Sequence, residues 1–79
     1  MIDTHGLPMK FEFCWSCMYY EVDFNDCRDG NPKLTVMETG EVEWGNKPER
    51  YAAMIAAGSW KITNVLEPLG KPVSVEDLL

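Results

Sequence analysis

The sequence predicts an α+β domain: a small, mostly antiparallel sheet of about four strands packed by one main helix, with a short C-terminal helical turn. Aromatic and β-branched residues crowd the first third of the chain, as is typical of strands. The links between extended runs are short, which favours antiparallel neighbours, and one segment carries strong helix start and stop signals. With 79 residues the chain has room for a single domain, residues 1–79.

Residues 10–24 contain no Pro or Gly and are predicted to be extended. Apolar side chains occupy odd positions from 11 to 19, and even positions at Val22 and Phe24. A one-residue bulge near Tyr19 and Tyr20 would produce this change of phase. A tight break into two strands is the alternative.

Residues 25–32 are dense in Asn, Asp and Gly, which bond their own backbone or accept a positive φ. We therefore expect a loop there. Residues 33–38 and 41–44 are two short extended runs joined through Thr39 and Gly40, and this pattern predicts a hairpin.

A helix is predicted over about residues 47–57. Asn46, with Glu49 three residues later and Pro48 in the first turn, is a start signal. Gly58 is a natural stop, because glycine readily adopts the positive φ that ends many helices.

The remainder of the chain predicts a last strand over residues 60–67 with one buried face. Residues 68–72 are expected to turn. Ser74 is a plausible N-cap for the short C-terminal helical turn.

The face of the sheet opposite the helix needs a cover of its own. The even positions of the first strand are not typical of a solvated surface: Cys14, Ser16, Met18 and Tyr20. We expect an interface there with the C-terminal turn, a second protomer or another protein. A homodimer or an accessory subunit is therefore an alternative function.

The cysteines suggest another alternative, a small zinc or redox module. Cys14 and Cys17 form a C-x-x-C, and with Cys27 and His5 they supply the ligand types that bind zinc. In a regular strand, residues three apart point to opposite faces, so the first two thiols would not meet one ion. A thioredoxin-type pair begins a helix, and no helix start follows Cys14. We therefore expect free thiols, no metal and no cofactor, with Cys27 the most exposed.

Motifs of catalysis are absent from the sequence. There is no P-loop, no G-x-G-x-x-G and no nucleophile fixed beside a base, and His5 is the single histidine. The acidic loop after residue 24 places Cys27 and Val36 where calcium ligands should stand. We therefore expect a protein that is not an enzyme.

The chain is acidic, with a formal charge of −6. This argues against direct binding to nucleic acid or to anionic membranes, which attract Lys and Arg. Residues 12–43 carry eight acids against two bases, which is the whole of the net charge. No stretch approaches the ~20 apolar residues of a membrane span, and the start has no features of a secretion signal. We expect a cytoplasmic protein.

The acidic side chains are the best candidates for a binding surface. Glu21 and Asp23 lie two apart on a predicted strand, as do Glu41 and Glu43, so each pair points the same way with about 6.6 Å between members. Such an array can occupy a basic groove, although solubility charges on a solvated face are the alternative explanation. Trp44 or Tyr20 could supply an aromatic anchor, since binding energy concentrates in such residues. The expected partner-binding residues are Glu21, Asp23, Asp26, Asp29, Glu38, Glu41, Glu43, Trp44 and Tyr20.

In small size, acidity and lack of motifs, the chain resembles the acidic proteins of phages and mobile elements, anti-CRISPR inhibitors among them. The resemblance implies a non-enzymatic inhibitor that acts in the cytoplasm of a host cell. Its partner would be the basic protein surface of a nuclease or another nucleic-acid-binding complex. The protein itself would bind no nucleic acid directly.

Overall fold

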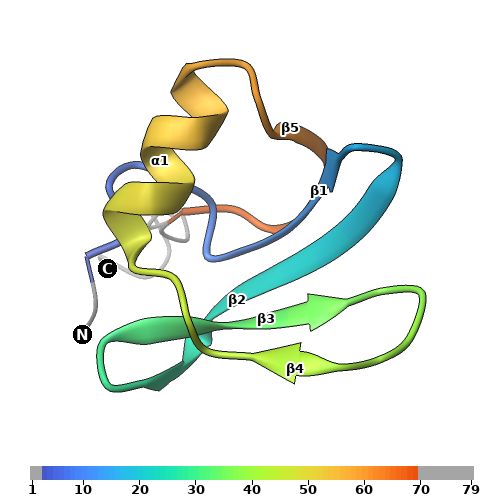
Figure 1. The fold of residues 1–79 in the computed structure, drawn as a ribbon. Helices are drawn as coiled ribbons and strands as arrows, with labels where there is room; N and C mark the ends of the chain where they lie inside the picture. The colour runs from blue at the N-terminus through green and yellow to red at the C-terminus, as the bar shows by residue number, and fades with distance from the viewer. Residues whose placement is uncertain (1–2, 70–79) are drawn as a thin grey trace, which may run out of the picture.

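The computed structural model describes residues 3–69, which form one five-stranded antiparallel sheet and one helix (Figure 1). The elements in chain order are β1 Lys10–Trp15, β2 Met18–Arg28, β3 Asn31–Val36, β4 Val42–Glu43, α1 Pro48–Ala56 and β5 Lys61–Glu67. The strand order is β4-β3-β2-β1-β5, so the last strand returns to pair with the first. The α+β prediction is confirmed, with five strands instead of about four.

The first predicted strand is two strands joined by a tight turn. Ser16 and Cys17 both have positive φ, 51° and 65°, as a type I′ hairpin turn requires. The pairing of Phe13 with Tyr20 puts both side chains on the same face of the sheet. The change of phase therefore comes from the turn. The expected bulge near Tyr19 and Tyr20 is wrong, and the alternative of a break into two strands is correct.

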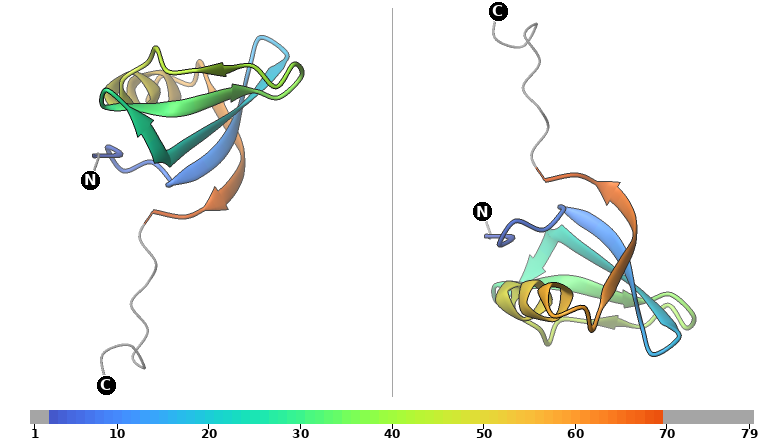
Figure 2. Two further views of the ribbon diagram at one scale, coloured as in Figure 1. Left: turned by 90° about the horizontal axis from the view of Figure 1, so that it is seen from below. Right: turned by 90° about the horizontal axis from the view of Figure 1, so that it is seen from above.

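The predicted loop over residues 25–32 is also wrong. β2 continues to Arg28, and the turn is reduced to Asp29 and Gly30, with φ of 55° and 80°. Pairing with β3 is interrupted after Asp23, and the next paired residue of β2 is Cys27. The intervening residues bulge, and β2 bends sharply there (Figure 2). This bend allows the sheet to curl around its core.

The hairpin predicted over residues 33–44 is confirmed as β3 and β4, although β4 is only two residues long. Leu34 pairs with Glu43 and Thr35 with Val42. The turn closes where the Val36 N–H donates to the Glu41 carbonyl at 2.8 Å. Because facing residues share a side of the sheet, Glu43 lies on the same side as the buried Leu34.

The helix α1 forms close to the predicted bounds. Its first residue is Pro48 and the N-cap is Lys47, which makes no side-chain capping bond, so Asn46 is not the cap. Gly58, with φ 79°, follows its end. β5 confirms the expected last strand, but its expected buried face is wrong, because Leu66 is 42% exposed and Ile62 is only partly buried. The turn of residues 68–72 extends beyond the described residues, and the helical turn from Ser74 lies wholly outside them.

The core lies between the helix and the concave side of the curled sheet (Figures 1 and 2). Tyr51 of α1 is fully buried, with its ring centroid 6.1 Å from that of Phe13 and 5.6 Å from that of Trp60. The buried apolar residues are Leu7, Phe11, Phe13, Val22, Phe24, Leu34, Tyr51 and Trp60.

The segment before β1 is packed. Thr4 and Leu7 are buried, and the Leu7 N–H donates to the Thr4 carbonyl at 3.0 Å. His5 Nε2 lies 3.4 Å from a carboxylate oxygen of Glu49 in α1. Within residues 3–69, no helix is long and apolar enough to cross a membrane.

Candidate protein-binding surfaces

The side of the sheet that faces away from α1 carries a group of carboxylates. Phe11 and Val22 point into the core, so the alternate residues Glu12, Glu21 and Asp23 point away from it. In the pairing of β1 with β2, Glu12 lies directly opposite Glu21. We call this surface, defined by Glu12, Glu21 and Asp23, the outer face.

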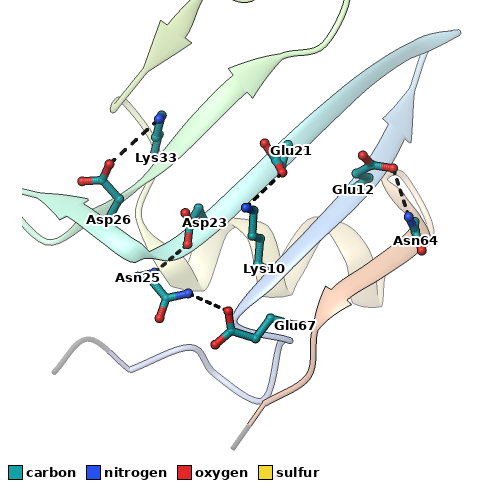
Figure 3. Close-up of polar contacts among 9 residues, drawn as sticks. All are labelled: Lys10, Glu12, Glu21, Asp23, Asn25, Asp26, Lys33, Asn64 and Glu67. Carbon is teal, nitrogen blue, oxygen red and sulfur yellow. Dashed lines mark hydrogen bonds and ion pairs between the residues drawn. The ribbon is translucent and has the colours of Figure 1, made fainter.

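Two lysines neutralise part of the charge around the outer face (Figure 3). Lys10 Nζ lies 3.6 Å from a Glu21 carboxylate oxygen, and Lys33 Nζ lies 4.0 Å from an Asp26 oxygen. Glu12 instead accepts a long hydrogen bond of 3.5 Å from the amide of Asn64. Glu12 therefore faces another carboxylate and has only a neutral side-chain partner among the residues the structure describes.

β5 adds a carboxylate that the sequence pattern did not indicate. Glu67 pairs with Lys10 across β1 and β5, and its side chain accepts a hydrogen bond of 3.1 Å from the Asn25 amide (Figure 3). Asn25 lies in the bent part of β2, and its backbone N–H donates to Asp23 Oδ1 at 2.9 Å. The bend thus brings the last strand beside the acidic residues of β2.

The structure separates the remaining predicted acids. Asp29 lies in the turn between β2 and β3, whereas Glu38 and Glu41 lie in the turn between β3 and β4, at the other end of β3. β4 begins at Val42, so Glu41 and Glu43 are not a row on one strand. Of the seven predicted carboxylates, the structure groups three on or beside the outer face: Glu21, Asp23 and Asp26.

The two predicted aromatic anchors do not lie on the outer face as free side chains. Tyr20 stacks on Phe13 at 5.1 Å between ring centroids, on the core side of the sheet, so its expected place on an uncovered face is wrong. Trp44 is half-buried, with the Arg28 guanidinium 4.5 Å above its ring.

Tyr20 instead lines a pocket on the core side of the sheet. The pocket has a volume of about 140 Å³, and we call it the aromatic pocket. Trp15 is 48% exposed at this pocket, and its ring centroid lies 6.1 Å from that of Trp60. The lining residues are Phe13, Trp15, Tyr20, Leu34, Glu43, Asn46 and Trp60. Sequence reasoning missed this site because its aromatic residues come from β1, from β2 and from Trp60, which immediately precedes β5.

Two buried side chains near the pocket carry polar atoms with few partners. The Trp60 Nε1 makes no hydrogen bond to any described residue. The Tyr51 hydroxyl makes no well-formed hydrogen bond either, although the Asn46 side chain acts on it. Burial raises the pKa of Tyr51, a hydrogen bond with the Asn46 side chain lowers it, and the Glu43 carboxylate raises it further. Trp60 and Asn46 line the pocket, and Tyr51 lies behind them in the core.

The cysteines do not form a metal-binding group. Cys14 lies in β1 and Cys17 in the adjoining turn, whereas Cys27 is near the other end of β2. Among residues 3–69, no three His, Cys, Asp or Glu side chains are grouped as metal ligands. Cys27 is exposed, and its Sγ donates to the Phe24 carbonyl at 3.1 Å. Partial burial raises the pKa of this thiol, and nearby Asp23 and Asp26 raise it further.

Comparison with protein family models, with curated proteins and with solved structures finds no match to this chain. The outer face and the aromatic pocket are the candidate binding surfaces among the described residues.

Proposed function

We propose that this protein is a non-enzymatic inhibitor that binds the basic surface of a nucleic-acid-binding or nuclease complex through its outer face. The observation that carries the proposal is the pairing of β1 with β2, which places Glu12 directly opposite Glu21. Asp23 continues the row along β2. Three carboxylates therefore project from one rigid piece of sheet.

The spacing of these groups is regular. Glu21 and Asp23 lie about 6.6 Å apart along their strand, and the strands of Glu12 and Glu21 lie about 4.8 Å apart. A carboxylate array of this density can take the place of nucleic-acid phosphates in a groove lined by Lys and Arg. Charge complementarity then speeds the encounter and fixes the register of the complex.

The outer face is not arranged for stability alone. Like charges directly opposite each other on neighbouring strands are destabilising. Lys10 contacts Glu21 in the structure, and Glu12 receives only the weak bond from Asn64. Cations of a partner would relieve this repulsion. An acidic partner surface would increase it, so the arrangement favours a basic partner.

The proposal is tested by capture of partners from a host cell extract at low salt, followed by elution with a salt gradient. We expect basic nucleic-acid-binding proteins to be captured and released at moderate salt, because the Debye length falls from about 10 Å at 0.1 M to about 3 Å at 1 M. With a purified partner, fluorescence anisotropy should show release of its bound nucleic acid.

A matched pair of variants makes the test specific. Glu12→Gln with Glu21→Gln removes two charges from the outer face, and Glu38→Gln with Glu41→Gln removes two charges from the β3–β4 turn. Only the first variant should lose the partner. Equal losses in both variants, or capture that does not depend on salt, would contradict the proposal.

A further inference from the structure

We propose that the aromatic pocket is a second binding site, which takes an arginine side chain of a protein partner. The pocket opens on the core side of the sheet, so this inference goes beyond the proposed role of the outer face. It rests on two features of the pocket: an indole ring without a cation over it, and a carboxylate at the same place.

The first feature is a comparison among the three tryptophans. Arg28 lies 4.5 Å from the centre of the Trp44 ring, and Arg50 lies 6.0 Å from the centre of the Trp60 ring. Among the described residues, no cation lies over Trp15, although its side chain is 48% exposed. The fold thus gives two indole rings an arginine of the same chain and leaves the third open to a partner.

The second feature is the size and charge of the pocket. Its volume is about 140 Å³, and an apolar cavity of about 150 Å³ accepts a benzene-sized group. The planar guanidinium of arginine is of similar size. Among the described lining residues, Glu43 carries the one charged side chain. The guanidinium of Arg50 lies 6.0 Å from the centre of the Trp60 ring, which also lines the pocket. The pocket therefore favours a further cation only where that cation can contact the Glu43 carboxylate.

Together these features favour arginine over lysine. The guanidinium is flat, stacks on aromatic rings and donates from five N–H groups, so it can contact Trp15 and Glu43 at once. The ammonium of lysine is a compact, strongly hydrated charge. The chain itself uses arginine, and not lysine, above its other two indole rings.

The experiment is an NMR titration of the full chain with a blocked Gly-Arg-Gly tripeptide. The matched control is the same tripeptide with citrulline, which is nearly isosteric with arginine and uncharged. We expect saturable shifts of the Trp15 indole signal with the arginine peptide, and about fivefold weaker binding of the citrulline peptide, as a cation–π contact implies. The Gly-Lys-Gly peptide should bind more weakly than the arginine peptide.

Variants assign the site. Glu43→Gln should weaken binding of the arginine peptide, whereas Glu41→Gln, which removes the same charge from the neighbouring turn, should not. Trp15→Leu should abolish the peptide-induced shift of the Trp60 indole signal in the same pocket, and unchanged amide signals elsewhere show that each variant folds. The Glu12→Gln/Glu21→Gln variant should bind the peptide normally, so failure of this inference is distinguishable from failure of the outer-face proposal.

Three outcomes would overturn the inference. Equal binding of the arginine and citrulline peptides would mean that the pocket does not select a cation. Equal effects of Glu43→Gln and Glu41→Gln would mean that only net charge matters. The absence of saturable Trp15 shifts up to the solubility limit of the peptide would mean that the pocket does not bind the side chain.

Discussion

Replacing Glu12 by Gln should stabilise the protein at low salt. Glu12 and Glu21 face each other across β1 and β2, so their carboxylates repel. The substitution removes one charge and keeps a side-chain oxygen that can still accept the hydrogen bond from Asn64. No other described contact of Glu12 depends on its charge.

The magnitude follows from the strand geometry. Facing residues of an antiparallel pair have Cβ atoms about 5 Å apart, which puts the two charges at roughly 6 Å. Coulomb's law in water then gives about 0.7 kcal/mol of repulsion, and screening at 0.1 M salt leaves about 0.4 kcal/mol. For a domain of this size such a gain raises the Tm by about 2–3 °C.

The assay is urea denaturation and thermal unfolding at low salt and in 1 M NaCl. We expect the gain of Glu12→Gln to be largest at low salt and nearly absent in 1 M NaCl, where the Debye length is about 3 Å. Glu38→Gln is the control, because it lowers the net charge equally from an exposed turn. A loss of stability in Glu12→Gln, a gain that persists in 1 M NaCl, or an equal gain in Glu38→Gln would show that repulsion between Glu12 and Glu21 does not destabilise the fold.

Three further predictions concern single features of the fold. Tyr51→Phe should leave stability at neutral pH unchanged or raise it by up to about 1 kcal/mol, because the buried hydroxyl makes no well-formed hydrogen bond, although the Asn46 side chain acts on it. Burial raises the pKa of Tyr51, so its contribution is present below the unfolded pKa and is lost as the pH rises through the folded pKa. Tyr51→Phe should therefore shift alkaline unfolding, followed by circular dichroism, to higher pH. Asp26→Asn should lower the raised pKa of Cys27 and speed its alkylation, measured by peptide mass spectrometry. Ser16→Asn with Cys17→Gly should stabilise the β1–β2 turn by about 1 kcal/mol in urea denaturation, because both positions have positive φ.

Each of these predictions has a result that contradicts it. A loss of stability in Tyr51→Phe at neutral pH would show that the hydroxyl makes a useful hydrogen bond in solution. Unchanged alkylation of Cys27 in the Asp26→Asn variant would show that the carboxylate does not act on the thiol. Failure of the Asn-Gly turn to stabilise would argue against the positive φ values at Ser16 and Cys17.

Local sequence signals were sufficient to predict the helix and the fold class. Pro48 near the start and Gly58 after the end defined α1 because both residues restrict or permit particular backbone angles whatever surrounds them. The β1–β2 turn had no such signal. Ser16 and Cys17 are not turn residues of the type I′ class, and their positive φ values are imposed by the pairing of the two strands. Strand pairing likewise extends β2 to Arg28, through residues that by themselves favour a loop.

For the candidate site, the sequence predicted only which residues of a single strand share a face. Alternation along β2 correctly placed Glu21 and Asp23 on one face. The opposition of Glu12 to Glu21 depends on the register, which the unrecognised turn determined. The aromatic pocket depends on still longer range order, because Trp15 and Trp60 meet only when β5 returns to pair with β1.

The outer face and the aromatic pocket lie on opposite sides of one sheet, and this geometry leads to a last prediction. β4 is an edge strand, with β3 as its single neighbour among the described strands. A single partner that used both surfaces would have to reach around this edge. Two separate partners would each contact one side.

Glu12→Gln and Glu43→Gln, singly and together, distinguish these arrangements when binding is measured by calorimetry with each captured partner. If one partner uses both surfaces, each single variant weakens its binding, and the losses in binding free energy should add within about 0.5 kcal/mol because the positions are separated by the sheet. If there are two partners, each variant weakens only one of them. Unchanged affinity in the double variant would exclude both surfaces, because each proposal requires its carboxylate to face a cation of the partner.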